Sequence, residues 1–437
     1  MLRKISKFIG LGAALSLITG PALAEGVSPE TAYVFNTFLF LVCGFLVMFM
    51  AAGFAMLESG MVRSKNVATI CLKNISLFSI AGLMYWLVGY NLMYGIEEGG
   101  YIGELFSVWS ADDSAIAAET PDFSGGYAAG SDWYFQMVFC ATTASIVSGT
   151  IAERMKLWPF LIFTLFLTGF IYPIVGSWEW GTGWLDAMGF SDFAGSTLVH
   201  STGGWAALMG AIILGARSGK YGPDGQVNPI PGSSMPLATL GTFILWLGWF
   251  GFNGGSQLAL GSGADAAAIS NIFINTNIAA AAGVMVAMLA SQVLYRKVDL
   301  TMALNGAIGG LVSITAEPLT PSIPAAVFIG GVGGLLVVLT VPLLDKLKID
   351  DVVGAIPAHL VCGMWGTLIV PLTNGDASYG VQLIGIIAVG VFTSIVSGVL
   401  WTALKATIGI RVDEDEELMG LDKTELGIEA YPEFART

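Results

Sequence analysis

His200 and His359 are the only histidines among the 437 residues, and each lies in an uncharged apolar stretch long enough to cross a bilayer. Imidazole can donate or accept a hydrogen bond and can carry a proton near neutral pH. Ionisable side chains at membrane depth commonly line ion or proton pathways, although a buried neutral histidine can also serve only to hydrogen-bond a neighbouring helix. A glycine follows each histidine four residues later, at Gly204 and Gly363. This matched pattern favours a shared functional role.

The composition indicates a polytopic membrane protein. Hydrophobic residues make up 55% of the chain and charged residues 11%, with a mean hydropathy of +0.75, whereas about a quarter of a soluble domain is charged. The 57 glycines suit helices that pack closely in lipid. The formal net charge of −14 does not indicate a nucleic-acid partner.

The four cysteines are scattered singly through apolar stretches, with no Cys-x-x-Cys pair and no histidine at ligand spacing. This pattern predicts neither a zinc site nor a disulfide framework. We expect Cys43, Cys71, Cys140 and Cys362 to be packing residues, and we expect no metal and no cofactor.

Residues 1–24 read as a secretory signal peptide. Basic residues at Arg3, Lys4 and Lys7 precede an apolar stretch over 8–18, and a small-residue cleavage site follows at Ala24. An uncleaved anchor is the alternative, but the apolar stretch is too short to span a membrane. The predicted organisation is a signal peptide over 1–24, a transmembrane domain over 25–404 and a cytoplasmic tail over 405–437.

Eleven stretches of bilayer length follow the signal, and together they predict an all-α fold. They lie near residues 32–57, 75–96, 133–152, 157–178, 193–216, 235–258, 269–294, 300–316, 323–344, 352–372 and 380–404. Outside the signal, Lys and Arg fall in or beside alternate connections or in the tail, whereas the opposite connections carry carboxylates such as Glu97, Glu104 and Asp112. Because cations accumulate in cytoplasmic loops, this pattern places the mature amino terminus outside and the carboxyl terminus in the cytoplasm.

The two histidines fall in the fifth and tenth predicted spans. If five spans are repeated with inverted topology, equivalent spans enter the membrane from opposite sides and can meet at the midplane, where transporters of this kind build their sites. We therefore expect a 5+5 inverted repeat, with the eleventh span outside it.

Several motifs lie in order along nearly the whole mature chain. They are AAGFAMLESG at 51–60, IAER at 151–154, Asp192-Phe-Ala-Gly195 with His200 eight residues after the aspartate, GWFGFNGGS at 248–256, and GLD at 420–422 with Ala430-Tyr431. Together they resemble the motifs of the ammonium transporter (Amt/Mep/Rh) family. The resemblance implies an eleven-helix subunit in a homotrimer, one narrow pore in each subunit and no enzymatic activity.

The resemblance also assigns roles to particular residues. It implies twin pore histidines at His200 and His359, a phenylalanine gate at Phe139 and Phe252, an outer recruitment site at Trp180, Phe139 and Ser256, and a buried acid beside that site at Asp192. Many members carry an acid five residues before the second histidine and a glycine directly after it, where this chain has Gly354 and Leu360, and a tail histidine where it has Leu426. The first two departures bear on the geometry around His359.

The residue types suggest how such a pore works. A small cation over the ring of Trp180 or Phe139 gains cation–π attraction of about 1–2 kcal/mol when partly desolvated, and Ser256 can accept a hydrogen bond from ammonium. Desolvation deeper in the pore favours loss of the proton, after which ammonia passes the histidines, with or without a co-transported proton. Asp192 can bind ammonium or cap the fifth span, and its place near a helix start favours the cap.

Two alternatives remain open at this point. A protein with this fold can be an ammonium sensor that binds without appreciable transport, although the short acidic tail does not suggest a signalling module. Two histidines on two spans can also ligate a b-type haem in a membrane redox protein. For the transporter we expect ammonium, ammonia and the analogue methylammonium as substrates, a bacterial inner membrane as the location, and a cytoplasmic PII-type regulator as a possible partner.

Overall fold

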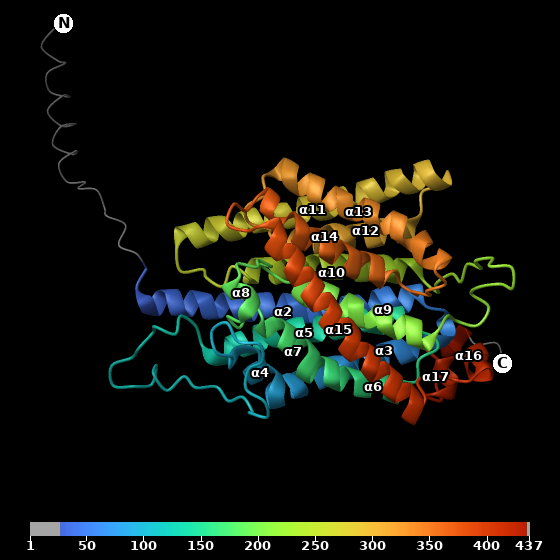
Figure 1. Ribbon diagram of the computed structural model, residues 1–437, viewed down its shortest axis with the longest axis horizontal. Helices are drawn as coiled ribbons and strands as arrows, with labels where there is room; N and C mark the ends of the chain where they lie inside the picture. Colours follow the sequence, from blue (N-terminus) through green and yellow to red (C-terminus); the bar gives the residue numbers. More distant parts are fainter. Residues whose placement is uncertain (1–26, 435–437) are drawn as a thin grey trace, which may run out of the picture.

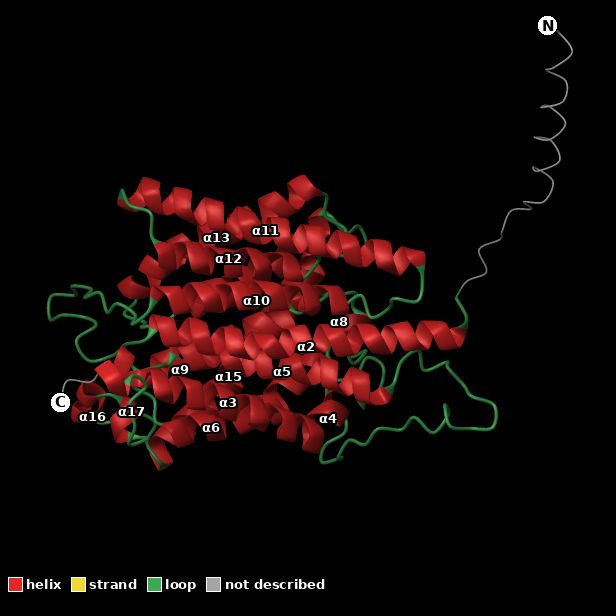
Figure 2. Ribbon diagram, turned by 180° about the vertical axis from the view of Figure 1, so that it is seen from behind, coloured by secondary structure: helices red, strands yellow, loops and turns green. Residues whose placement is uncertain are grey.

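The computed structural model describes residues 27–434, so the predicted signal peptide lies outside the described residues. Within that part, eleven helical segments run side by side as one bundle (Figures 1 and 2). The only β-pairing there is two isolated bridges, Met155 with Arg411 and Tyr221 with Val227. The predicted all-α fold is confirmed.

The first five segments contain residues 29–214. They are α2 (Pro29–Met61); α3 (Val67–Met84) continued through η2 (Tyr85–Gly89) into α4 (Tyr90–Tyr94); α5 (Ala129–Thr150); α6 (Leu157–Phe166) continued through η3 (Leu167–Ile171) into α7 (Tyr172–Ser177); and η4 (Ser196–Ser201) continued into α9 (Thr202–Leu214). The one-turn helices η1 (Ser64–Asn66) and α8 (Trp184–Ala187) lie in connections.

The next six segments contain residues 235–407. They are α10 (Met235–Gly255), α11 (Gly263–Tyr295), α12 (Leu300–Thr315), α13 (Ile323–Lys346), η5 (Ile356–Val361) continued through α14 (Cys362–Ile369) into η6 (Val370–Leu372), and α15 (Tyr379–Thr407). After α15 come α16 (Glu414–Met419), α17 (Leu421–Thr424) and η7 (Pro432–Phe434).

The helix lengths agree with membrane spans. Eight segments in the described part are long and apolar enough to cross a membrane, and α12 and the η5–η6 segment are shorter apolar helices. The remaining segment, α5, has 22 residues, or about 33 Å at 1.5 Å per residue. Its composition is more polar, since it includes Gln136, Thr143 and Ser148, and these side chains are buried inside the bundle.

Serine caps begin several of the long helices. The capping hydroxyl accepts a hydrogen bond from a backbone N–H of the first turn, which has no partner within the helix. The caps are Ser28, Ser234, Ser262, Ser322 and Ser378. Three of these helices also carry proline in the first turn, where its missing N–H costs nothing.

One predicted boundary differs from the structure in a way that affects the chemistry. The second span was expected to start at residue 75, which left Lys73 in a connection. In the structure α3 begins at Val67, and Lys73 is a buried residue of this helix. On the facing helix, α2 continues to Met61 and so includes the buried Glu58.

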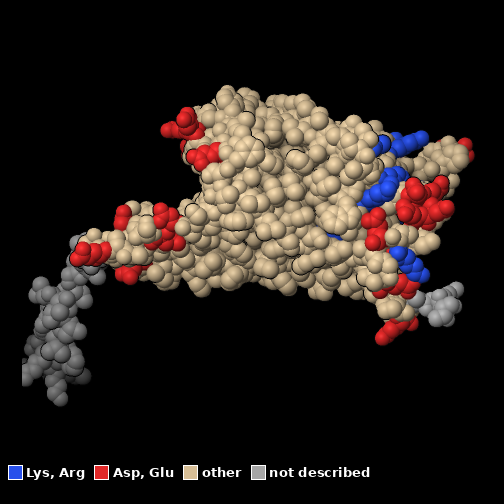
Figure 3. All heavy atoms as spheres, turned by 90° about the horizontal axis from the view of Figure 1, so that it is seen from below, with Lys and Arg blue, Asp and Glu red and all other residues tan. Residues whose placement is uncertain are grey.

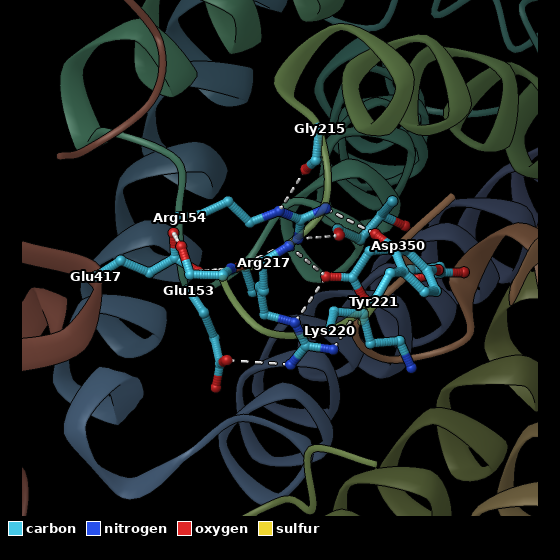
Figure 4. Close-up of polar contacts among 12 residues, drawn as sticks. Glu153, Arg154, Gly215, Arg217, Lys220, Tyr221, Asp350 and Glu417 are labelled. Carbon is cyan, nitrogen blue, oxygen red and sulfur yellow. Dashed lines mark hydrogen bonds and ion pairs between the residues drawn. The ribbon is translucent and has the colours of Figure 1, made fainter. Parts of the chain in front are cut away.

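On the face drawn in Figure 3, basic side chains gather at one end of the bundle, among carboxylates, and the opposite end shows carboxylates without basic side chains. At the basic end Arg217 joins two connections: its Nε lies 2.8 Å from an Asp350 oxygen, and its Nη1 lies 3.0 Å from an oxygen of Glu153 (Figure 4). Arg63 lies 2.7 Å from the same Glu153 oxygen. Burial alone would raise the pKa of Asp350, but the hydrogen bonds of Arg217 and the charges of Arg154 and Arg217 lower that pKa below its usual range.

The segment after α15 folds back over this end of the bundle, where α16 and α17 lie beside the inter-helix loops (Figure 1). Glu417 accepts hydrogen bonds from the backbone N–H of Ser218 and from Arg411. The Asp422 carboxylate accepts from the backbone N–H groups of Ala68 and Thr69, which are orphan donors at the start of α3. These contacts join the tail to the start of α3 and to a connection that carries the ion pairs.

Candidate functional site

The structure brings the two histidines together at the centre of the bundle. His200 comes from η4 and His359 from η5, and both are buried. Their Nδ1 atoms lie 3.2 Å apart and their ring centroids 5.2 Å apart. At this distance one Nδ1 donates a hydrogen bond and the other accepts it, so a proton has a direct path between the rings.

An aspartate that accepts backbone hydrogen bonds precedes each of the two histidines. Asp192 lies eight residues before His200 and accepts hydrogen bonds from four backbone N–H groups, those of residues 195–198, at 2.7–3.1 Å. Asp351 lies eight residues before His359 and accepts from the N–H groups of Gly354 at 3.2 Å and Ile356 at 2.7 Å. Each carboxylate therefore caps the helical turn that carries a histidine.

The glycine three residues after each aspartate makes this turn possible. Gly195 has φ of 104° and Gly354 has φ of 80°, a left-handed backbone conformation that glycine adopts without strain. An added Cβ at Gly354 would also lie 2.8 Å from Nδ2 of Asn305. Gly354, which departs from the family pattern, therefore corresponds to Gly195 of the first half of the repeat. Asp351 corresponds to Asp192.

Sequence reasoning missed Asp351, although the signal was present. Both halves contain Asp-x-x-Gly followed by histidine five residues later and glycine four residues after that. The family pattern points to an acid five residues before the second histidine, whereas the aspartate that matches Asp192 lies eight residues before it.

The glycine after each histidine lets the two half-sites touch. A Cβ on Gly204 would lie 2.8 Å from the backbone N of Leu360, and a Cβ on Gly363 would lie 2.3 Å from the carbonyl oxygen of Ser196. Leu360 thus packs against Gly204, and its side chain is buried in an apolar cluster with Ile356 and Ala206. Leucine at this position is compatible with the 3.2 Å contact.

An aromatic pair closes the route on one side of the histidines. The rings of Phe139, from α5, and Phe252, from α10, are stacked with centroids 4.0 Å apart. The ring centroid of His200 lies 5.2 Å from that of Phe252 and 5.0 Å from that of Trp249. The pathway at the phenylalanine pair is therefore apolar and filled by side chains.

Beyond the aromatic pair, toward the end of the bundle opposite the basic side chains, lies a cavity of about 330 Å³ that brings together Phe139, Trp180 and Ser256; we call it the outer cavity. The indole N–H of Trp180 donates to the backbone oxygen of Asp192 at 3.1 Å, which fixes the ring beside Phe139. The Ser256 hydroxyl donates to the carbonyl of Phe252 at 2.9 Å, so the oxygen lone pairs remain able to accept.

The outer cavity also contains polar residues that sequence reasoning missed. Asp132 lies in α5, seven residues before Phe139 and four before Gln136, so all three share one helix face. The Tyr90 hydroxyl donates a hydrogen bond to Asp132, and the Gln136 amide lies 3.5 Å from its other oxygen. The aspartate was overlooked because it fell just ahead of the predicted span.

On the other side of the histidines, two cavities lead toward the basic end. The first, of about 10 Å³, is lined by His359, Phe54 and Glu58, among others. The second, of about 300 Å³, lies beneath the 215–234 connection, and Asn305 and Val353 line both. The fold and this central route define a membrane channel or transporter for a small solute.

Comparisons with known proteins identify the family of this membrane protein. The sequence model of the Ammonium Transporter Family matches residues 38–431. Ammonium transporter Amt2 of Archaeoglobus fulgidus is 41% identical over 428 residues, covering 91% of this chain and 88% of that protein. A putative ammonium transporter of Synechocystis sp. is 40% identical over 432 residues, covering 96% of each chain.

Solved structures agree with the sequence comparison. A Sensor Amt Protein has a TM-score of 0.82 at 36% identity, covering 90% of this chain and 98% of the other. Candida albicans Mep2 has a TM-score of 0.78 at 28% identity, covering 91% and 90%. The chain belongs to the ammonium transporter family, which consists of membrane transport proteins and not enzymes.

The histidine pair does not fit the haem alternative. An iron atom between two imidazoles needs the ligating nitrogens about 4 Å apart, at roughly 2 Å per metal–nitrogen bond, and the plane of the macrocycle between them. The facing nitrogens lie 3.2 Å apart, and Phe252 and Trp249 pack against the His200 ring. Direct hydrogen bonding accounts for this geometry.

Proposed function

We propose that this protein transports ammonium across the membrane by recruiting the cation at the outer cavity, removing its proton and conducting ammonia past the histidine pair. The observation that carries the proposal is one connected arrangement: the cavity with Phe139, Trp180 and Ser256, the stacked phenylalanines, and histidine nitrogens 3.2 Å apart. Membership of the family supports ammonium as the substrate.

The outer site suits a small cation that carries N–H donors. Trp180 and Phe139 present aromatic rings to the cavity, and a partly desolvated cation gains about 1–2 kcal/mol over such a ring. Ser256 supplies a hydrogen-bond acceptor, and Asp132 supplies a carboxylate. Potassium gains the ring attraction but cannot donate a hydrogen bond to the serine.

The stacked phenylalanines favour the neutral form beyond that point. A cation passing between Phe139 and Phe252 loses its water in an apolar constriction, and desolvation destabilises the charged form. Ammonia is small and neutral, and it can both donate to and accept from the imidazoles of His200 and His359. We infer that the cation gives up its proton at the outer side of this constriction.

Asp192 acts in this scheme as a support and not as a ligand. Its carboxylate already accepts four backbone hydrogen bonds, which leaves little capacity for ammonium. It fixes the turn that carries His200, and its backbone oxygen fixes the Trp180 ring.

Transport is preferred to sensing because the route continues past the histidines. A protein that only reports ammonium needs an outer site, whereas this chain also has two cavities on the inner side. The Sensor Amt Protein has a similar fold, so sensing is the alternative that an experiment must separate.

Radiolabelled methylammonium uptake by proteoliposomes separates the two functions. We expect time-dependent accumulation inside vesicles that carry the protein, and at least a tenfold loss of accumulation in the His200→Ala variant with unchanged oligomeric state. Ile395→Ala, an exposed apolar position on α15, is the matched control and should transport normally. Saturable binding with no accumulation would identify a sensor instead.

The arrangement in the membrane is part of the same proposal. The basic side chains at one end (Figure 3) support a cytoplasmic location for that end and for the tail, by the positive-inside rule. We place the protein in a bacterial inner membrane as a homotrimer with a cleaved signal peptide, and we place a PII-type regulator at the cytoplasmic face. Protease protection of the tail in inverted and right-side-out vesicles tests the orientation.

A further inference from the structure

Glu58 is a buried carboxyl that the transport scheme above does not use. It lies near the end of α2 with 1% of its surface exposed. Its Oε2 accepts hydrogen bonds from the Asn74 amide at 3.2 Å and the Ser148 hydroxyl at 2.9 Å. Its Oε1 is buried and has no hydrogen-bond partner among the described residues. Buried carboxyl oxygens are normally satisfied, so this exception calls for a function.

The small inner cavity connects this carboxyl with the histidine pair. Glu58 and His359 both line it, and its volume of about 10 Å³ corresponds to roughly one water molecule. Because Nδ1 of His359 faces His200 at 3.2 Å, the opposite ring nitrogen, Nε2, is the one left for the cavity. A single water there can bridge Nε2 and the carboxyl.

A buried cation balances the carboxyl on its other side. Lys73 of α3 is 1% exposed, and its ammonium group donates to the backbone oxygen of Ser148 at 3.0 Å and lies 4.5 Å from the centroid of the Phe160 ring. Ser148 therefore contacts both charged groups, through its carbonyl and its hydroxyl. A fixed positive charge nearby lowers the cost of a negative carboxylate in this place, so Glu58 can exist with or without a proton.

The small cavity beside Glu58 adjoins a second, larger cavity. Asn305 and Val353 line both the small cavity and the larger inner cavity of about 300 Å³. The larger cavity includes Arg217 and Asp351 and lies at the basic end of the bundle. The small cavity that Glu58 lines therefore adjoins a larger cavity on the side that we propose to be cytoplasmic.

We propose that Glu58 is the proton acceptor on the inner side of the histidine pair, receiving the proton that His200 and His359 pass inward. In this step the Nε2–H bond of the His359 imidazolium breaks, the bridging water accepts that proton and gives up another, and an O–H bond forms on Oε1. The imidazolium becomes neutral and the carboxylate becomes a neutral acid. Release of the proton to water in the larger cavity restores the carboxylate, and the ammonia and proton together amount to transported ammonium.

The inference rests on the proposed transport function, and the ratio of charge to substrate tests it separately. Proteoliposomes of one preparation are measured for current on an ammonium pulse and for radiolabelled methylammonium uptake. In Glu58→Gln we expect the current per unit uptake to fall at least tenfold while uptake stays within threefold of wild type. Glu58→Asp, which keeps the carboxyl, should recover part of the ratio. A merely structural role would lower current and uptake together.

Two further variants separate the loss of the Glu58 carboxyl from the loss of charge balance and from the loss of any buried carboxyl. Glu58→Gln leaves Lys73 without its counter-charge, so the double variant Glu58→Gln/Lys73→Met removes both charges and should show the same low ratio. Glu317→Gln, at a buried carboxyl near the outer end of α12 that accepts from Asn374, should keep the wild-type ratio. A wild-type ratio in the double variant, or uptake without current in wild type, overturns the inference. Absence of wild-type accumulation instead overturns the transport function.

Discussion

At the scale of single residues, the outer cavity combines aromatic rings with a carboxylate. In the proposed scheme Trp180 and Phe139 attract a cation through their rings, and Asp132 adds a carboxylate seven residues from Phe139 on the same helix face. Tyr90 and Gln136 hold that carboxylate in place by hydrogen bonds. The site is therefore expected to bind ammonium by attraction to a charged carboxylate as well as by cation–π attraction.

Asp132→Asn tests this contribution. Asp132 is buried, and a charge pair at about 4 Å is worth on the order of 1 kcal/mol even at the dielectric constant of bulk water, which sets a lower limit of roughly a fivefold change in affinity. We expect the half-saturating methylammonium concentration to rise at least about fivefold while the maximal uptake rate stays near wild type, as measured in proteoliposomes. Glu119→Gln, an exposed acid of the outer loop, should leave both parameters unchanged. An equal effect of the two variants would reduce the role of Asp132 to general surface charge.

At the scale of elements, the histidine contact depends on two helical turns that meet in opposite directions. Asp192 and Asp351 cap these turns, and glycines at positions 195 and 354 allow the left-handed backbone that follows. Gly204 and Gly363 then let each turn pass close to the backbone of the other. The same spacing of aspartate, glycine and histidine in both halves therefore brings His200 and His359 into contact.

Gly363→Ala tests this close approach. The added Cβ would meet the Ser196 carbonyl at 2.3 Å and the Ser201 hydroxyl at 2.4 Å, so the two elements must separate. Overpacking of this kind costs about 1–3 kcal/mol, and a wider histidine contact should reduce methylammonium uptake at least tenfold. Thermal unfolding in detergent and vesicle uptake measure the two effects.

Gly375→Ala is the matched control for that substitution. Gly375 lies in the connection before α15, and nothing lies within 4 Å of a Cβ placed there. We expect wild-type unfolding and uptake from this variant. Normal uptake by Gly363→Ala would mean that the histidine pair tolerates separation of its two turns.

At the scale of the whole molecule, composition and spacing predicted the eleven-span bundle, and the expected inverted repeat together with the family resemblance predicted the histidine pair. Long apolar stretches identify spans because lipid leaves the backbone few alternatives. The sequence did not reveal Glu58 and Lys73 as buried residues, because only the facing helices show that Ser148 contacts both. Asp132 was missed because it lies just ahead of the predicted span, and its partner Tyr90 is 42 residues away in the chain.

The ion-pair network at the basic end predicts an acid-dependent stability. The folded-state pKa of Asp350 is lower than its ordinary value because Arg217 and Arg154 outweigh the effect of burial, whereas an unfolded aspartate titrates near about 3.9. A lowered folded-state pKa stabilises the protein above the unfolded pKa, and this stabilisation is lost as the pH falls toward the folded pKa. We expect wild-type thermal stability in detergent to fall from about pH 5 downward.

Asp350→Asn should remove part of this pH dependence and destabilise the protein at neutral pH. The variant leaves Arg217 buried without one of its partners, and removing one member of a buried ion pair costs about 3–5 kcal/mol. The matched control is Asp345→Asn, because Asp345 is partly exposed and lies 3.2 Å from Lys220, and such pairs contribute about 0–1 kcal/mol. Thermal unfolding of both variants between pH 3 and pH 7 decides the matter. Equal losses at pH 7 would show that burial of the Arg217–Asp350 pair adds nothing, and the loops and tail would then be held mainly by the backbone contacts of Glu417 and Asp422.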